Sequence, residues 1–163
     1  MKTIGFYAFA NSGLQSIQFP KSVTTIQSSA FEECSRLSGD LVLPEGVTTI
    51  NQRTFYNCQA LTRSLTIGKD VSSIGHYAFY QCKFTGNLNL PTDQLSTIGN
   101  GAFQGCSGLT GPLNIDGVTS LGYDAFNGCS GLSGPLVFAG NLGTINHHAF
   151  YQYRQSYYIQ KIP

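Results

Sequence analysis

Five cysteines offer the most distinctive chemistry in this 163-residue chain, because thiolates bind metals, form disulfides and act as nucleophiles. No two of them have the Cys-x-x-Cys spacing of a zinc site. Each follows a phenylalanine by three residues, and the five are Cys34, Cys58, Cys82, Cys106 and Cys129. Cysteines in neighbouring repeats would have nearly parallel Cβ directions, which is poor disulfide geometry. We therefore predict a column of buried, reduced cysteines that pack as small hydrophobic side chains, with no metal and no cofactor.

The histidines are also candidates for metal binding. His76 and His147 occupy the same position of a repeat, and His148 follows directly. The two equivalent histidines lie three repeats apart, or about 14 Å at the usual strand spacing. That separation is too large for one metal ion, so the sequence predicts solvent-facing histidines.

A row of acidic residues could in principle bind Ca²⁺ or cleave glycosidic bonds. Its members fall near the same corner in four consecutive repeats: Glu45, Asp70, Asp93 and Asp116. No second acidic row faces it, and carboxylates beside proline and glycine commonly form turns. The sequence also lacks the Gly-x-Ser-x-Gly nucleophile motif and the phosphate-binding loop. We predict that no residue is catalytic and that the chain is not an enzyme.

The composition narrows the function classes further. Hydrophobic residues make up 41% of the chain, enough for a substantial core, whereas charged residues make up only 10%. The formal net charge of +1 argues against a nucleic-acid-binding protein, which usually has a basic stripe. No apolar run approaches the roughly 18 residues of a membrane span. These values predict one folded domain whose polar surface is mostly uncharged.

An internal repeat positions all of these residues. In each repeat an aliphatic residue is followed, five positions later, by a phenylalanine, and successive phenylalanines are 22 to 24 residues apart. The seven phenylalanines are Phe9, Phe31, Phe55, Phe79, Phe103, Phe126 and Phe150. One repeat buries too little apolar surface to offset its chain entropy, so stacked repeats must share a core. The spacing predicts a solenoid of about six to seven repeats with these phenylalanines in one column.

Each repeat contains three predicted elements. The alternating Leu-x-Leu segment predicts a short strand with one buried face, and the Val-Thr-Thr-Ile segment predicts a second one. The Ala-Phe-x-x-Cys-x-x-Leu segment has apolar residues at helical offsets over barely two turns, which predicts a short helix or 3₁₀ turn. Glycines such as Gly111, before Pro112, are predicted to form the corners between these elements.

Three segments, LVLPEGVTTINQRTFYNC, LTIGKDVSSIGHYAFYQC and LNIDGVTSLGYDAFNGCSGL, resemble BspA-like leucine-rich repeats, also called the Treponema-type class. The resemblance covers about residues 1–153 and departs from the pattern where Gly68, Asp116 and Ala139 replace proline. It implies an α/β repeat solenoid, a right-handed leucine-rich-repeat superhelix with short parallel strands and short helical or 3₁₀ turns. It also implies a bacterial or protozoan cell-surface or secreted protein associated with adhesion, and it brings no shared catalytic residue.

The predicted function is therefore a non-enzymatic protein-interaction or adhesion module that binds through an extended solenoid face. If the Leu-x-Leu strands line that face, the exposed residues between the leucines are Gln18, Val42, Thr66, Asn89, Asn114 and Val137. The partner would be a host matrix or cell-surface protein or a glycan, and the chain would be a monomer. A structural spacer and a solenoid that binds or degrades polysaccharide are the alternatives.

The two ends of the chain differ from the inner repeats. Ser12 and Tyr153 replace the repeat cysteine, and the first repeat starts part-way through the pattern, so we expect a piece of a longer precursor. Tyrosines crowd the C-terminus at Tyr151, Tyr153, Tyr157 and Tyr158. Residues 1–163 are predicted to form a single leucine-rich-repeat domain in which residues 151–163 cap the exposed core.

Overall fold

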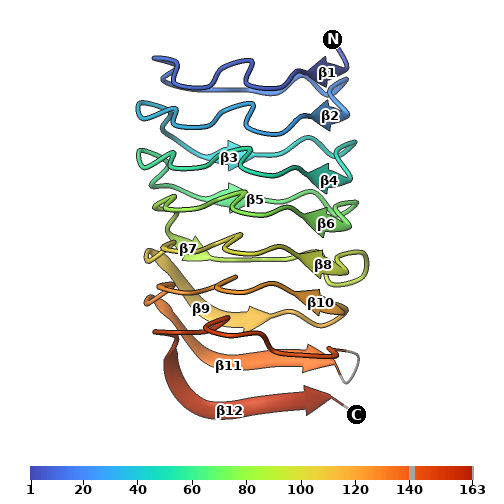
Figure 1. The fold of residues 1–163 in the computed structure, drawn as a ribbon, viewed down its shortest axis with the longest axis vertical. Coiled ribbons are helices and arrows are strands. Elements are labelled where there is room, and N and C mark those ends of the chain that lie inside the picture. Colours follow the sequence, from blue (N-terminus) through green and yellow to red (C-terminus); the bar gives the residue numbers. More distant parts are fainter. Residues whose placement is uncertain (140–141, 163) are drawn as a thin grey trace.

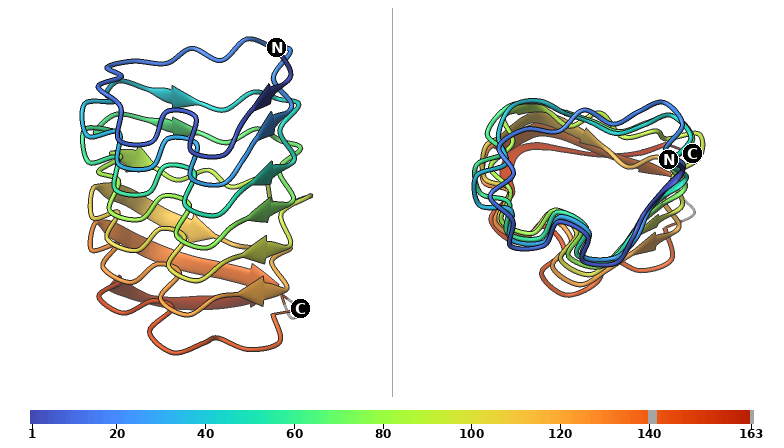
Figure 2. Two further views of the ribbon diagram at one scale, coloured as in Figure 1. Left: turned by 45° about the horizontal axis from the view of Figure 1, so that its top comes forward. Right: turned by 90° about the horizontal axis from the view of Figure 1, so that it is seen from above.

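The computed structural model describes the backbone of residues 1–139 and 142–162, and the side chains of residues 1–138 and 142–153. The chain winds into a solenoid whose turns stack along one long axis (Figure 1). Seen from the N-terminal end, the chain runs clockwise as it descends, so the solenoid is right-handed (Figure 2). Each turn, called a rung below, carries one of the seven repeat phenylalanines. The predicted repeat solenoid is confirmed.

All strand pairs are parallel, and the strands form two walls of the solenoid (Figure 1). The first wall holds the Val-Thr-Thr-Ile strands in the sheets β1–β2 and β4–β6–β8–β10. Their bounds are β1 Thr3–Ile4, β2 Thr25–Ile26, β4 Thr49–Ile50, β6 Ser73–Ile74, β8 Thr97–Ile98 and β10 Ser120–Leu121. The second wall, called the sheet face below, holds the sheets β3–β5 and β7–β9–β11–β12. Their bounds are β3 Leu41–Val42, β5 Leu65–Thr66, β7 Gly86–Asn87, β9 Leu109–Asn114, β11 Leu132–Ala139 and β12 Arg154–Ile162.

The Leu-x-Leu strands form as predicted except in two rungs. In the fourth rung β7 ends at Asn87, just before the predicted Leu88–Leu90 segment. In the first rung the segment Ile17–Phe19 is not a strand.

Gly111 and Pro112, predicted to form a corner, lie inside β9, a strand that itself curves at the edge of the sheet face (Figure 1). The pairing of β9 with β11 shifts register between Leu132 and Leu136, as at a β-bulge. Gly111 has a φ of 77°, and a Cβ atom there would lie 2.5 Å from Oδ1 of Asn87. Glycine suits this position because its φ is positive, and the extra residues of the bulge lie on β11, where Leu132 and Leu136 pair with Gly111 and Leu113.

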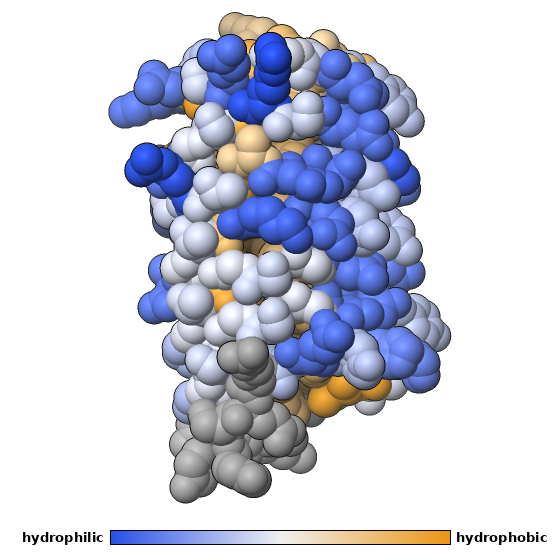
Figure 3. Space-filling view, turned by 90° about the vertical axis from the view of Figure 1, so that its left-hand side faces the viewer, coloured by the Kyte–Doolittle hydropathy of each residue, from blue (hydrophilic) through white to orange (hydrophobic). Residues whose placement is uncertain are grey.

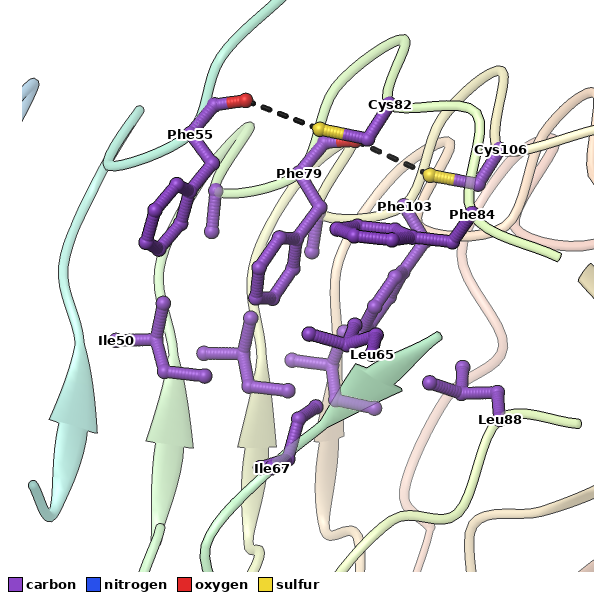
Figure 4. Close-up of a cluster of buried hydrophobic side chains, with 14 of the residues drawn as sticks. Ile50, Phe55, Leu65, Ile67, Phe79, Cys82, Phe84, Leu88, Phe103 and Cys106 are labelled. Atoms are coloured by element: carbon purple, nitrogen blue, oxygen red, sulfur yellow. Dashed lines mark hydrogen bonds between the residues drawn. The ribbon is translucent and has the colours of Figure 1, made fainter. Parts of the chain in front are cut away.

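The phenylalanine column predicted from the repeat spacing is confirmed. Successive rings from Phe9 to Phe150 stack with centroids 5.2 to 5.8 Å apart and interplanar angles of no more than 20°. Aliphatic side chains such as Ile50 pack beside the column (Figure 4). Phe84 is fully buried and lies edge-on to Phe79. Other rungs have a leucine three residues after the repeat cysteine, whereas Phe84 follows Cys82 by two residues.

The Ala-Phe-x-x-Cys segment forms consecutive turns, and the described residues contain no helix, so neither the short helix or 3₁₀ turn nor the α/β class predicted for the solenoid is confirmed. The N–H of Tyr56 donates within its rung to the carbonyl of Arg53 (3.1 Å), whereas the N–H of Phe55 donates to Ala78 of the next rung (2.8 Å). Because alternate amides bond to the next rung, the continuous bonding of a helix cannot form. Two residues per rung adopt left-handed φ, as at Arg53 (54°) and Asn57 (59°). The described part of the chain accordingly has no helix that is long and apolar enough to cross a membrane.

Candidate interaction surfaces

The five cysteines form a second column beside the phenylalanines, and all five are buried. Their thiols point back to the preceding rung: Sγ of Cys82 donates to the carbonyl of Phe55, and Sγ of Cys106 to that of Phe79, both at 3.1 Å (Figure 4). Burial raises the pKa of Cys82 and of Cys129 to about 12. The predicted buried column is confirmed, but the thiols are also hydrogen-bond donors to backbone carbonyls, a role that sequence analysis missed.

We expect thiol titration in denaturant, without reductant, to recover about five free thiols per chain, because each thiol has a carbonyl partner of its own. At about pH 8, Cys82, Cys106 and Cys129 should react at least about tenfold more slowly in the folded protein than in denaturant. Burial keeps their pKa values high, and the thiolate is the reactive form. Recovery of a single thiol in denaturant would show that the others are paired and would contradict the prediction.

The histidines and the acidic row have structural contacts. No group of three or more His, Cys, Asp or Glu that could hold a metal ion occurs in the residues that the structure describes. His76 is exposed, as predicted, and its Nδ1 accepts a hydrogen bond from the N–H of Asn100 at 2.8 Å. In the acidic row, Oδ1 of Asp116 accepts the N–H of the next residue at 3.1 Å, and Asp70 pairs with Lys69 at 2.7 Å. These contacts support the interpretation of the row as turn-forming carboxylates.

The predicted binding row lies on the sheet face, where its members alternate with buried residues. Five of the six are exposed, namely Gln18, Val42, Thr66, Asn89 and Asn114. The sixth, Val137, is only half-buried rather than exposed. Val42 lies opposite Thr66 between β3 and β5, and Asn114 lies opposite Val137 between β9 and β11. The alternation of the strands thus positions the row, and its part in binding stays a prediction.

A cavity of about 700 Å³ opens at the N-terminal end of the sheet face. It lies between residues 16–21 of the first rung and residues 38–45 of the second, and Gln18 and Val42 of the predicted row line it. Lys21, Asp40 and Glu45 also contribute to the lining. The hollow combines apolar groups with charges of both signs.

The turns around the phenylalanine column make a third wall, called the turn wall below, which is the notched side of the solenoid in Figure 2. It comprises residues 5–11, 27–33, 51–57, 75–81, 99–105, 122–128 and 146–152. The neighbouring corner, where the chain passes from the turn wall to the sheet face, is covered mainly by hydrophilic side chains (Figure 3). The turn wall differs from that corner because it carries a series of aromatic side chains.

A polar and aromatic cluster occupies the second to fourth rungs of the turn wall. Arg53 pairs with Glu32 of the preceding rung, and its guanidinium lies 3.9 Å from the ring centroid of Tyr56. The ring of Tyr56 stacks on that of Tyr80 at 4.7 Å, and Tyr77 meets Tyr80 edge-on at 5.9 Å. Burial opposes ionisation of Glu32, but hydrogen bonding and the charge of Arg53 outweigh it and lower the pKa of this carboxyl. Sequence analysis missed this cluster, although the repeat spacing already places an acid and a base on adjacent rungs.

The last rungs repeat the same arrangement with histidine in place of arginine. Nδ1 of His148 lies 3.6 Å from Oδ1 of Asp124, and its ring centroid lies 5.2 Å from that of Tyr151. His148 occupies the repeat position of Arg53, and Tyr151 that of Tyr56. The turn wall therefore holds a basic side chain against a tyrosine ring and an acid of the preceding rung at two places.

The repeat pattern and the solenoid match one family of known proteins. The family model for the BspA type leucine rich repeat region matches six copies, over residues 2–133 and 39–158. The chain belongs to the BspA-type leucine-rich repeat family. The resemblance drawn from the repeat motifs is thus confirmed.

Solved structures of leucine-rich repeat proteins resemble this BspA-type chain. A leucine-rich repeat protein from Bacteroides ovatus is 28% identical, with a TM-score of 0.80 over 94% of this chain and 40% of that one. The leucine-rich repeat protein of T. pallidum is 28% identical, with a TM-score of 0.72 over 85% of this chain and 67% of that one. A leucine rich cell surface protein from Faecalibacterium prausnitzii, 23% identical, shares the fold, with a TM-score of 0.62 over 92% of this chain and 50% of that one. No curated protein matches the sequence.

Proposed function

We propose that this BspA-type repeat domain is a non-enzymatic protein-interaction module. The observation that carries the proposal is the solenoid, in which one stacked core supports long walls of exposed side chains. Such walls offer extended contact to a macromolecule, whereas small-molecule sites are usually concave and enclosed. The leucine-rich-repeat fold of the Bacteroides and T. pallidum structures supports the same role.

We further propose that the domain is part of a larger cell-surface or secreted protein and binds host matrix or cell-surface proteins as a monomer. A protein of the same fold from Faecalibacterium prausnitzii is described as a cell surface protein. The match covers only 40% of the Bacteroides protein. In a longer protein of that kind, other domains would determine how this domain is displayed to a partner. A structural spacer is the alternative, and it would bind no partner.

The C-terminal segment 151–163 is proposed to cap the core. Tyr153 supports this role, because its ring meets Phe150 edge-on at 6.2 Å and its hydroxyl donates to the carbonyl of Gly134 at 3.3 Å. The backbone of β12 adds a parallel strand beside β11. The side chains of Tyr157 and Tyr158 lie outside the described residues.

Charge substitutions on the sheet face test the predicted row. We expect the variants Thr66→Lys, Asn89→Lys and Asn114→Lys, combined in one protein, to lose about tenfold or more in capture by a partner from a panel of purified extracellular-matrix proteins. All three side chains are exposed, so thermal unfolding should change little. Because the row is uncharged, capture by the wild type through this face should depend weakly on salt. Unchanged capture would move the binding site to another wall, and no capture by the wild type would favour the spacer.

A further inference from the structure

The exposed aromatic side chains of this protein gather on the turn wall and not on the sheet face. Six exposed aromatic residues occur on the turn wall in the part of the chain with described side chains: Phe6, Tyr7 and Phe9 in the first rung, Tyr151 in the last, and Tyr77 and Tyr123 in the rungs between. Phe9 belongs to the phenylalanine column, so Tyr77 and Tyr123 are the exposed aromatic residues of the inner rungs. On the sheet face, Val42 is the one large hydrophobic residue exposed among those described. Aromatic residues, tyrosine above all, are enriched among the side chains that dominate binding energy at protein interfaces. The aromatic distribution therefore marks the turn wall as a contact surface.

The turn wall also differs in charge from the rest of the chain. Of the nine lysines and arginines, it contains only Arg53, whereas it contains three carboxylates, Glu32, Glu33 and Asp124. Its residues therefore have a formal net charge of −2 with neutral histidines, whereas the whole chain has a net charge of +1. Nζ of Lys83, just outside these ranges, donates to Oε1 of Gln81 and to the carbonyl of Gly105, which brings the charge on the wall to −1. Arg53 is already paired with Glu32, so a cationic partner would meet uncompensated negative charge on this wall.

Arg53 shows how this wall holds a guanidinium group. Its Cζ lies 3.9 Å from the ring centroid of Tyr56, while Glu32 pairs with its Nη2. Arginine prefers such sites because its planar cation stacks on an aromatic face and donates to a carboxylate at the same time. Tyr77 and Tyr123 remain exposed, at 37% and 53%, two rungs apart on the same wall.

We propose that the turn wall is a docking surface for a protein segment that bears arginine side chains, which lie against the exposed tyrosines Tyr77 and Tyr123. This inference rests on the proposed interaction function and names the surface and the chemistry of the partner. Tyrosine supplies rigid contact area at low cost in side-chain entropy, and the stacked rungs place Tyr77 and Tyr123 on the same wall. Glu33 lies beside Tyr56, because its N–H bonds to the carbonyl of that residue. Its carboxylate has no ion-pair partner among the described side chains, so it adds to the attraction of the wall for an arginine side chain.

A neutral glycan is the other macromolecular class that tyrosines and amides could recognise. Sugar rings also bind to aromatic faces, so the exposure of Tyr77 and Tyr123 alone does not separate the two classes, and the charge of the wall decides between them. A glycan has no use for the negative charge of the wall. The observations therefore favour an arginine-bearing segment.

The test uses the full 163-residue chain and a labelled peptide of four Arg-Gly-Gly units, with a Lys-Gly-Gly peptide of the same length as its control. Fluorescence anisotropy at low salt should show binding of the arginine peptide. The double variant Tyr77→Ser/Tyr123→Ser should weaken it about tenfold. Thr49→Ala removes an exposed side chain from the wall of Val-Thr-Thr-Ile strands and should leave binding unchanged. Glu33→Gln should weaken binding about threefold, whereas Glu45→Gln, with the same change in charge on an exposed residue away from the turn wall, should not.

Several outcomes would overturn the inference. Equal loss for Glu33→Gln and Glu45→Gln, or equal binding of the lysine peptide, would indicate non-specific charge attraction. Tyrosine-dependent binding of a neutral oligosaccharide panel, without binding of the arginine peptide, would assign the wall to glycans. If matrix proteins are captured equally by wild type and Tyr77→Ser/Tyr123→Ser, the inference fails and the proposed function stands. If the wild type captures none of them, the proposed function fails. Salt adds a second criterion, because binding through the turn wall should weaken as salt rises, unlike binding through the sheet face.

Discussion

Replacement of Phe79 by alanine is expected to lower the free energy of unfolding by about 3–5 kcal/mol. Its ring is fully buried in the middle of the column, with Phe55 stacked on one side at 5.7 Å and Phe103 on the other at 5.2 Å. Phe84 also packs edge-on against it at 5.8 Å. Removal of the ring leaves a cavity that three aromatic neighbours line, and the backbone bonds between rungs prevent its collapse. Urea unfolding followed by circular dichroism measures the loss.

The matched control is Phe9→Ala at the start of the same column. Phe9 is 38% exposed and stacks on Phe31 alone, at 5.2 Å. Less apolar surface is returned to water and no enclosed cavity forms, so the loss should be less than half of that for Phe79→Ala. Solenoid stability depends on interfaces between adjacent rungs, so Phe79→Ala should also broaden the transition by uncoupling the two halves. Equal losses for the two variants would show that the column is not the main source of stability.

The column could be predicted from the sequence because its cause is simple periodicity. A large apolar residue at a nearly constant interval of 22 to 24 residues can be buried in every rung only if the rungs stack in register. The strands could be predicted from the alternation of apolar and polar residues, which is also a simple periodicity. Alternation also predicts a strand at Ile17–Phe19, where the structure has none, so alternation alone does not determine where a strand forms.

The turns show where sequence patterns fail. Phe55 and Cys58 are three residues apart, a spacing that fits one turn of a helix as well as two successive turns. What decides between them is where the backbone amides bond, and the amide of Phe55 bonds to Ala78, 23 residues away. One local signal was present, because left-handed φ favours Asn, Asp and Gly, as at Asn57 and Gly101. In other rungs tyrosine or arginine takes these positions, so the signal is hidden.

The same ambiguity explains why the turn wall was not predicted as a binding surface. Tyr77 and Tyr123 fall beside the segments for which the repeat pattern predicts short helical turns, and in a helix a residue's direction depends on the helical phase. Successive turns instead place these side chains outward, while the phenylalanine two or three residues later points into the core. The sheet face could be predicted because strand alternation alone assigns Val42 and Thr66 to the outside.

Replacement of Gly99 by alanine is expected to destabilise the protein by about 2 kcal/mol or more. A Cβ atom at Gly99 would lie 2.6 Å from the backbone nitrogen of His76 and 2.8 Å from the carbonyl carbon of Gly75. Both contacts are with backbone that is fixed by bonds between rungs, so no flexible side chain can move away. The control is Gly13→Ala, where a Cβ atom would meet nothing within 4 Å and should have an effect near zero.

Thermal and urea unfolding of both variants would show whether the rungs can separate locally. Asn51 occupies the repeat position of Gly99 two rungs earlier, where its Nδ2 donates to the carbonyl of Ile26 at 2.7 Å. A side chain is therefore tolerated at this position when the polar group replaces part of the contact between rungs. Alanine has no such group, so it pushes the rungs apart without bonding them. A loss below about 0.5 kcal/mol for Gly99→Ala would mean that the spacing between rungs adapts freely, and that close backbone approach is not the reason for glycine at this position.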